Sequence, residues 1–412
     1  MRILIYGMNY APELIGIGRY TGELGRWLAS RGHAVTVLAA PPYYPQWRVA
    51  DDYRPQRWLR ERLSGVEVLR APLYVPHRVT GKGRLLQELS FGISSLRWWA
   101  DLWQRRWDAV LTICPPLQSG LIPVWLARRQ RIPFIYHIQD FQLDAARELG
   151  ILRWSPFFAL FARLERFCLA QADVVTTISQ AMAARLRDKG TLGEKVRVLP
   201  NWADLDSIQP GSRNNPLRQE MGLNTEVIVL YAGNLGEKQG LETVLEAAAL
   251  TRRNPKICYV LAGEGAVKTR LMALAQQQGL GNLHFLPLQS NKRFPLLLAA
   301  ADIHLVIQRR KASDLLMPSK LANILAAGRP FIATALPETE LGRVTLASGA
   351  GALVAPEEPR DLARAILKLT ADDNEREMMG KRARSYAEAE LGRDNILAQW
   401  EQLLARLPVK IA

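Results

Sequence analysis

The 412-residue sequence contains little cysteine: only Cys114, Cys168 and Cys258 occur, far apart and without paired spacing. A disulfide framework or a cysteine-based zinc site needs paired cysteines, so we expect neither, and the usage fits a reducing compartment. The apolar start of the chain is too short for a signal peptide, and no apolar run approaches the ~20 residues of a membrane-spanning helix. These absences predict a cytoplasmic protein.

Acidic residues are scarce relative to basic ones, with 39 Asp+Glu against 54 Lys+Arg and a formal net charge of +15. The excess lies in the first half: residues 1–200 carry 28 basic and 16 acidic side chains (+12), whereas residues 201–412 carry 26 and 23 (+3). A basic surface indicates a polyanionic partner, which could be nucleic acid, anionic lipid headgroups or a phosphorylated substrate. Composition does not choose among these.

Strand-like and helix-like segments alternate, and the chain is longer than one hydrophobic core usually serves. Strand-like segments occupy residues 2–7, 34–39, 66–71, 108–113, 134–138 and 173–179, and, after a polar linker at 200–210, residues 227–233, 258–263, 283–288, 302–308, 330–335 and 351–355. This alternation predicts an α/β fold of two doubly wound, Rossmann-like domains facing across a cleft. We expect domains at 1–200 and 201–385, with a helix at 386–412 that packs back toward the first.

The loop after segment 227–233 has the composition of an anion site. Gly233, Gly236 and Gly240 allow backbone N–H groups to approach a ligand, Lys238 adds a positive charge, and a helix begins directly afterwards. A simple turn with a surface lysine is an equal alternative for this loop read alone.

Other candidates are weaker when each is taken alone. Gly16 and Gly18 form a glycine pair before a helix, and Glu264 lies in a Gly-Glu-Gly turn that could equally be structural. His137 and, three residues on, Asp140 stand where open α/β sheets carry catalytic residues, or they belong to a satisfied polar loop. Ser319 opens a helix whose first N–H groups could bind phosphate, or it is only a cap.

Taken together, these motifs resemble a known family. The loop GIGRY, the segments YHIQD and PNWADLD, the strand-loop YAGNLGEKQGL, the AGEG turn and PSKLANILAAGRP occur in the order and spacing of retaining glycosyltransferases of family four. The resemblance spans nearly the whole chain and implies the two-domain GT-B fold. APPYYPQW (40–47) and GNLGEKQGLE look closest to the glycosyltransferases of colanic acid and related exopolysaccharide assembly.

The resemblance also implies roles for single residues. Lys238 corresponds to the lysine on the donor pyrophosphate, and His137 to the histidine beside the transferred sugar. Gly16 and Gly18 correspond to the loop near the donor phosphates or the acceptor. Glu264 and the segment ending at Leu288 correspond to the region that holds the nucleotide base. Ser319 and Lys320 correspond to the helix start that faces the phosphates. Such enzymes are described as using front-face attack assisted by the leaving diphosphate, so we expect no dedicated nucleophile.

Two positions depart from the family pattern. Asn234 stands where the family usually has an arginine, and Asn323, which can still bond a ribose hydroxyl, stands in place of a glutamate. Arg309 or Arg310 could replace the missing guanidinium, or both belong to a solvated basic loop. The family has a motif of two glutamates, and Asp314 is the acidic residue nearest to the position of the first of them. Asp140 is a possible contact to the sugar.

The function predicted is transfer of a sugar from a nucleotide-diphosphate donor, with GDP-fucose favoured over UDP-sugars, to a polyprenyl-diphosphate-linked saccharide. We expect no cofactor and no metal, because the Asp-x-Asp pair Asp204 and Asp206 lies in the linker. The alternatives are a nucleotide-sugar epimerase of GT-B fold or a basic nucleic-acid-binding protein, although no recognised nucleic-acid module occurs.

A helical stretch at 78–107 suggests where a lipid acceptor would be met. Its apolar stripe is flanked by six basic residues against two acidic ones, a composition that suits the headgroup zone of an anionic membrane. The stripe consists of Leu85, Leu89, Ile93, Leu96, Trp99, Trp103 and Trp107. The chain would then associate peripherally with the inner face of the cell membrane; a core helix with a solvated basic face is the alternative.

Overall fold

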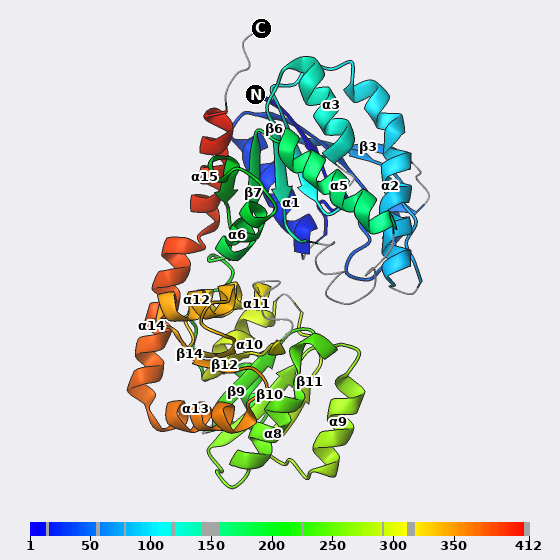
Figure 1. Cartoon of the computed structure of the whole chain (residues 1–412). Coiled ribbons are helices and arrows are strands. Elements are labelled where there is room, and N and C mark those ends of the chain that lie inside the picture. Colours follow the sequence, from blue (N-terminus) through cyan, green and yellow to red (C-terminus); the bar gives the residue numbers. More distant parts are fainter. Residues whose placement is uncertain are drawn as a thin grey trace. The chain divides into compact units, whose positions relative to one another are not determined.

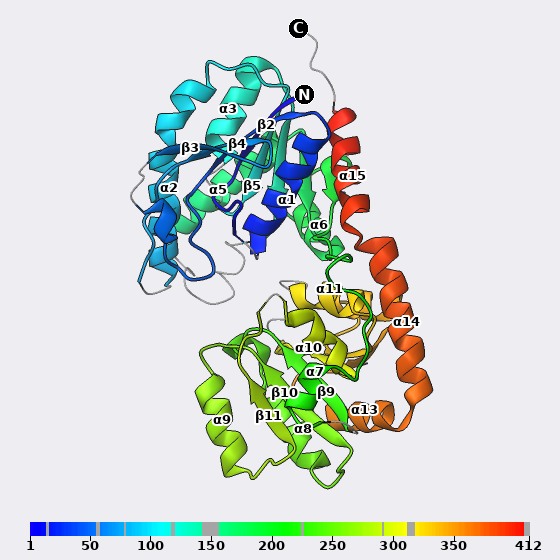
Figure 2. The same cartoon turned by 180° about the vertical axis from the view of Figure 1, so that it is seen from behind.

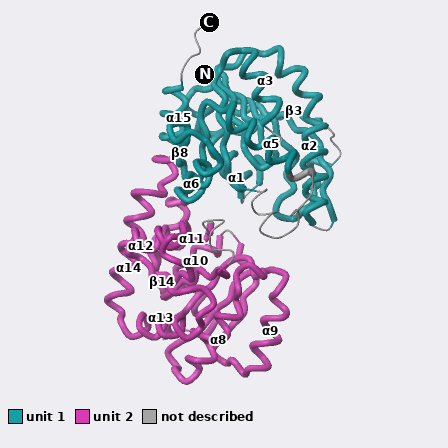
Figure 3. Tube along the Cα trace, in the orientation of Figure 1, with its two compact units in different colours: residues 1–200, 397–412 teal, residues 201–396 magenta. Residues whose placement is uncertain are grey.

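The computed structural model describes residues 1–13, 16–54, 58–77, 80–116, 120–141, 156–223, 226–290, 292–310 and 318–407. The chain divides into two compact units (Figures 1 and 3). Unit 1 consists of residues 1–200 and 397–412, and unit 2 of residues 201–396. The C-terminal helix α15 (Arg393–Ala405) begins in unit 2 and continues into unit 1 at Leu397.

Unit 1 is a sheet covered by helices. Its strands are β1 (Arg2–Tyr6), β2 (Ala34–Ala39), β3 (Leu59–Leu63), β4 (Val66–Arg70), β5 (Ala109–Cys114), β6 (Phe134–Ile138), β7 (Val174–Thr177) and β8 (Val196–Val198). Its helices are α1 (Gly16–Ser30), α2 (Gly81–Leu102), α3 (Leu121–Gln130), α5 (Pro156–Gln171) and α6 (Gln180–Asp188), with short 3₁₀ turns at Asp51–Tyr53 and Gly193–Lys195. Over the described residues the strand order is β3-β4-β2-β1-β5-β6-β7-β8, with β3 alone antiparallel.

Unit 2 repeats this architecture. Its strands are β9 (Val227–Ala232), β10 (Ile257–Ala262), β11 (Leu283–Leu286), β12 (Ile303–Val306), β13 (Phe331–Thr334) and β14 (Gly351–Val354). Its helices are α7 (Pro216–Glu220), α8 (Glu242–Thr251), α9 (Lys268–Gln277), α10 (Phe294–Ala300), α11 (Ser319–Ala326), α12 (Glu340–Ser348), α13 (Pro359–Ala371) and α14 (Asp373–Glu390), with the turn η4 (Glu237–Gln239) after β9. The parallel order is β11-β10-β9-β12-β13-β14.

Helices cover both faces of each sheet (Figures 1 and 2). In unit 1, side chains of α2, α3 and α5 share one core with the sheet, including Phe91, Val124 and Cys168. In unit 2, α8, α9 and α13 pack in one apolar cluster and α11, α12 and α14 in another. The predicted fold of two doubly wound, Rossmann-like α/β domains is confirmed.

The strand orders define where each sheet would bind a ligand. In both sheets the chain first winds outward in one direction and then returns to wind in the other, so β1 lies between β2 and β5, and β9 between β10 and β12. Open α/β sheets bind ligands at the carboxyl ends of the strands, beside this reversal. The ligand-binding positions expected from the topology are therefore the loops that follow β9 and β12 in unit 2 and β1 and β5 in unit 1.

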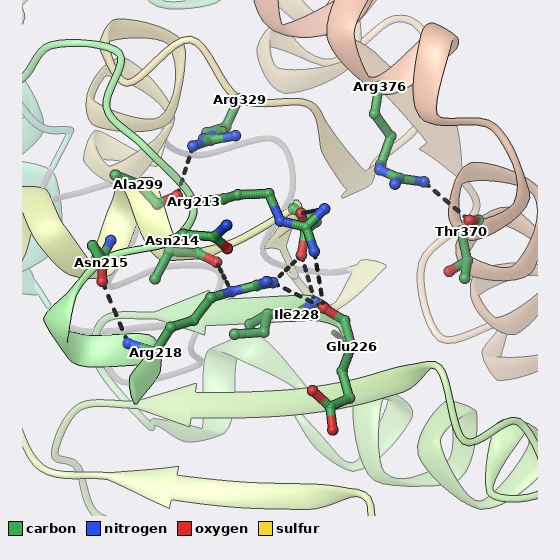
Figure 4. A network of polar contacts seen from close by, with 12 residues as sticks. Arg213, Asn214, Asn215, Arg218, Glu226, Ile228, Ala299, Arg329, Thr370 and Arg376 are labelled. Atoms are coloured by element: carbon green, nitrogen blue, oxygen red, sulfur yellow. Dashed lines mark hydrogen bonds and ion pairs between the residues drawn. The ribbon is translucent and has the colours of Figure 1, made fainter. Parts of the chain in front are cut away.

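The opposite, amino edge of the second sheet is fixed by a buried ionic cluster (Figure 4). Arg218 of α7 is 1% exposed and bonds the carboxylate of Asp302, which also accepts from the backbone N–H of Ile228 (2.8 Å). Arg213 approaches the same carboxylate at 3.3 Å, and Arg218 donates to the carbonyl of Ala300 (3.0 Å). The cluster ties α7 to the starts of β9 and β12, away from the ligand edge.

None of the helices in the described ranges has both the length and the hydropathy that crossing a bilayer requires.

Candidate active site

The loop between β9 and α8 needs glycine at two positions. Gly233 has a φ of +146°, and a Cβ there would lie 3.1 Å from Nζ of Lys320. Gly240 has a φ of +64°, and its Cβ would lie 2.8 Å from Cγ of Arg309. These backbone conformations are unfavourable for other residues, and the missing side chains let α11 and the segment after β12 approach the loop.

Arg309 holds this loop in place. Its Nε donates to the carbonyl of Glu237 (2.7 Å), and its guanidinium reaches the carboxylates of Glu242 (3.1 Å) and Glu357 (3.3 Å). Its backbone N–H donates to the carbonyl of Lys238 (3.1 Å). The guanidinium of Arg309 is thus engaged in positioning the turn that carries Lys238. The backbone N–H of Arg310 also donates to Glu357, at 3.4 Å.

Lys238 itself lies at the surface of this turn. Its side chain is exposed and forms no ion pair with any residue in the part of the chain that the structure describes. Asn234 is exposed in the same loop, and its carbonyl accepts a hydrogen bond from the hydroxyl of Tyr231 (2.7 Å). A fixed turn that presents an unpaired ammonium suits a phosphate ligand.

The turn after β10 packs backbone to backbone on the same loop. Gly263 has a φ of +145°, and a Cβ there would lie 1.9 Å from the carbonyl oxygen of Gly233. The N–H of Leu235 donates to the carbonyl of Glu264 (2.9 Å), while the Glu264 carboxylate is exposed and pairs with Lys268 (2.7 Å). The glycines of this turn are therefore required by packing, and its one carboxylate remains accessible to a ligand.

The start of α11 brings a second lysine to this edge. Nζ of Lys320 lies 3.6 Å from the centroid of the Tyr231 ring and is buried without a hydrogen-bond partner among the described residues. Burial lowers the pKa of Lys320 from 10.5 to about 7. Ser319 is the first residue of α11, and Asn323 follows one turn later, partly buried. Leu288, just beyond β11, is 70% exposed.

Asp314 and the side chain of Ser319, both predicted for the donor site, lie outside the described residues.

At the ligand edge of unit 1, a buried acid supports the glycine loop. Gly16, with a φ of +66°, begins α1, and a Cβ on Gly18 would lie 2.2 Å from Oε2 of Glu13. The Glu13 carboxylate accepts hydrogen bonds from the side chain of Asn9 (3.0 Å) and from the N–H groups of Tyr43 (3.2 Å) and Tyr44 (3.1 Å). Burial raises the pKa of Glu13. Sequence reasoning missed Glu13, although it directly precedes the loop that was singled out.

His137 is a buried residue at the end of β6. It is 4% exposed, its Nδ1 lies 2.9 Å from Oγ1 of Thr176, and its ring meets the edge of Trp400 at a centroid distance of 5.0 Å. Burial lowers the pKa of His137 to about 3, so its imidazole is neutral at neutral pH. Asp140, two residues past the strand, is partly exposed. The imidazole itself has little access to a ligand.

Both carboxylates of the Asp-x-Asp pair in the linker have partners. Asp204 accepts the N–H of Ser207 (3.0 Å), and Asp206 pairs with Arg393 (3.0 Å).

The same two units appear in comparisons with known proteins. Residues 16–202 match the family model described as "Glycosyl transferase 4-like domain", and residues 214–386 match "Glycosyl transferases group 1". The chain is also 40% identical over 409 residues to the glycosyl transferase WcaI of Escherichia coli K12, covering 97% of this chain and 98% of WcaI. The chain belongs to the family-four glycosyltransferases.

Solved structures show the fold of this glycosyltransferase. Sucrose-phosphate synthase from Thermosynechococcus elongatus superposes with a TM-score of 0.76 at 21% identity and 98% coverage of both chains. HepE of Anabaena, solved in complex with UDP, gives a TM-score of 0.72 at 17% identity, covering 98% of this chain and 100% of HepE. The expected GT-B fold of the glycosyltransferase is confirmed.

Proposed function

We propose that this glycosyltransferase moves a sugar from a nucleotide-diphosphate donor to a polyprenyl-diphosphate-linked saccharide during assembly of a colanic acid-type exopolysaccharide. The observation that carries the proposal is the edge of unit 2: the glycine loop after β9 carries the exposed Lys238, and the buried amine of Lys320, in the first turn of α11, lies against Gly233 of the same loop. WcaI, which is named for colanic acid biosynthesis, supports the pathway. GDP-fucose is the first donor to test, and UDP-sugars are the second, because HepE was solved with UDP-glucose.

The proposed transfer retains configuration at the anomeric carbon. The acceptor hydroxyl forms the new carbon–oxygen bond on the face from which the nucleotide diphosphate departs, and its proton passes to a leaving phosphate oxygen. Lys238 and the N–H groups at the start of α11 would stabilise the negative charge that develops on the diphosphate. His137, whose imidazole is neutral and bonded to Thr176, would act within unit 1 by fixing the carboxyl end of β6.

We also propose that this charge stabilisation works without a divalent metal. Lysine and helix N-termini supply the positive electrostatic potential that a metal provides elsewhere. Transfer should therefore continue in EDTA. Loss of transfer in EDTA, with recovery on adding Mg²⁺ or Mn²⁺, would overturn this part of the proposal.

Helix α2 supports peripheral binding to the inner face of the cell membrane, where a polyprenyl-linked acceptor resides. Its exposed apolar side chains recur at helical spacing, at Leu86, Leu89, Ile93 and Leu96. Exposed basic residues on the same helix include Lys82, Arg84 and Arg97. An apolar stripe with basic flanks suits the interface of an anionic bilayer.

The test of the function is a two-stage assay on the purified chain. Thermal shifts against GDP- and UDP-sugars identify the donor, and incubation with a polyprenyl-diphosphate saccharide then yields a product whose anomeric configuration is read by NMR. We expect one nucleotide class to raise the Tm, and transfer with retention. A donor-only reaction that yields an isomeric nucleotide sugar would assign an epimerase instead, and no shift with any nucleotide would refute the donor site.

A further inference from the structure

The donor edge of unit 2 has fewer available cations than the glycosyltransferase family normally places there. A donor diphosphate carries two negative charges, and the loop that would meet it offers Lys238 alone. Asn234 occupies the position of the family arginine, and Arg309 is bound to three glutamate residues, Glu237, Glu242 and Glu357. One further cation is needed to balance the charge of the ligand.

Lys320 is in the right place to supply it. Its Nζ is buried over the Tyr231 ring without a hydrogen-bond partner among the described residues. It also lies against Gly233, where the absent side chain leaves the amine covered only by backbone on that side. A buried amine without a partner is costly, so such an arrangement calls for a ligand.

We propose that Lys320 is the second phosphate-binding cation of the donor site, partly uncharged in the empty site and fully protonated as the donor diphosphate binds. This inference rests on the proposed function and specifies which groups hold the diphosphate. The first turn of α11, which contains Lys320, adds backbone N–H groups to the same site, and no side chain among the described residues caps them. Donor binding would therefore be coupled to uptake of a proton.

The surroundings of Lys320 agree with this behaviour. Desolvation lowers its pKa to about 7, and no acidic side chain among the described residues counteracts that effect. Tyr231, on β9, is itself buried, which raises the pKa of its hydroxyl, so the ring below the amine is neutral.

The charged or titratable groups on other elements that contact α11 do not neutralise Lys320 either. Arg384 of α14 donates to the carbonyl of Ala326 (2.8 Å), at the far end of α11. His304 of β12 bonds the carbonyl of Leu298 (3.0 Å), and burial lowers its pKa to about 3. The adjoining loop contributes the basic Lys238 and the acidic Glu237, whose carboxylate pairs with Arg270 (3.1 Å), and the segment after β12 contributes the glutamate-bound Arg309 and the exposed Arg310.

Isothermal titration calorimetry with GDP-fucose and with UDP-glucose tests the proposal. These diester diphosphates have no group that titrates near neutrality, so the dependence of the heat on the ionisation enthalpy of the buffer reports protons taken up by the protein. We expect proton uptake that increases from pH 7 to pH 8, since anion binding raises the pKa of Lys320 from about 7 back toward 10.5.

Three variants make the result specific. Lys320→Met should keep or raise the Tm, because it removes a buried polar group, but should weaken donor binding roughly tenfold or more and abolish proton uptake. Lys320→Arg should bind the donor without proton uptake, because arginine is already charged. Lys368→Met, an exposed lysine of α13, is the matched control and should behave as the unmodified protein.

The outcomes separate this inference from the function on which it rests. If the unmodified protein binds a nucleotide sugar and Lys320→Met binds it equally well, the assignment of Lys320 is wrong. Binding without proton uptake in the unmodified protein overturns the change of charge. If the unmodified protein binds neither probe, the proposed function fails, and this inference fails with it.

Discussion

At the scale of single residues, the exposed lysine of the β9–α8 turn has the clearest predicted effect. Lys238→Ala should lower kcat/KM by one to two orders of magnitude or so, because a charge-assisted contact to the departing diphosphate contributes about 1.5–3 kcal/mol. The measurement is steady-state transfer with the donor identified by thermal shift. Lys368→Ala, on the exposed face of α13, provides the control. An unchanged kcat/KM in a folded Lys238→Ala variant would remove Lys238 from the donor site.

The two buried histidines give a prediction about pH. Burial lowers the pKa of both His137 and His304 to about 3, whereas the unfolded chain has histidines near 6.5. Below pH 6.5 the unfolded state binds more protons than the folded state, so the stability that the neutral rings provide is lost as the pH falls from about 6.5 toward 3. Each histidine should contribute roughly 1.4 kcal/mol per pH unit over that window.

Urea unfolding at pH 7.5, 6 and 5 measures this effect. Because His137 lies in unit 1 and His304 in unit 2, both transitions should shift to lower urea as the pH falls. His137→Asn should reduce the pH dependence of the unit 1 transition alone, even though it lowers stability at every pH. A unit 1 transition that stays constant from pH 7.5 to 5 would be inconsistent with the buried, neutral imidazole.

At the scale of elements, helix α2 shows why its periodicity alone allowed two interpretations. Trp99 and Phe91 pack on Tyr6 in the core, with ring centroids 5.1 and 5.6 Å from it, whereas Ile93 is 70% exposed and Leu96 52%. The predicted stripe therefore runs from the solvent-exposed face into the core. A hydrophobic pattern gives the spacing of side chains and does not state which of them the sheet will cover.

Ile93→Glu tests the membrane role of this face. Vesicle co-sedimentation should rise with the fraction of anionic lipid, weaken in high salt and fall sharply for this variant, since a charge replaces an apolar contact with the bilayer. Leu250→Glu, at an exposed leucine on α8, is the matched control. If the unmodified chain does not bind anionic vesicles at low salt, the membrane role of α2 is wrong and the helix serves only to pack the core of unit 1.

The strands differ in how readily the sequence predicts them. Those inside the sheets are continuous apolar runs, such as residues 228–231, and were predicted close to their observed bounds. β3 was missed because it is an antiparallel edge strand of mixed polarity, LRERL, and β8 because it has only three residues. Burial on both faces leaves a clear signature in composition, whereas pairing at an edge leaves little.

The loops show a similar division. Gly233 and Gly240 could be predicted from the sequence, because their backbone has positive φ angles that favour glycine and the residue type itself is therefore the signal. The partners of Arg309 and the position of Lys320 over Tyr231 were not, because they depend on contacts between residues 48 or more apart in sequence. Local conformation can be inferred from a residue and its neighbours, but contacts between distant segments follow only from the folded chain.

At the scale of the whole molecule, the resemblance to family four predicted the fold, and comparison across nearly the full length of WcaI established the family. The individual site residues remain predictions. Both sheets reverse their strand order at the first strand of their series, which places the two glycine loops at equivalent positions in the two units. The division into two units could be predicted from the alternating strands and helices and from the polar linker at 200–210.

The route of the chain through its two units also determines the order in which they can be completed on the ribosome. Unit 2 is one continuous segment, 201–396, and can fold as soon as it has emerged. Unit 1 must wait for α15, because Trp400 packs on His137 and Glu401 pairs with Arg31 (3.1 Å). The part of the protein that is synthesised first is therefore finished last, and until then the face of the sheet beside His137 lacks its tryptophan cover.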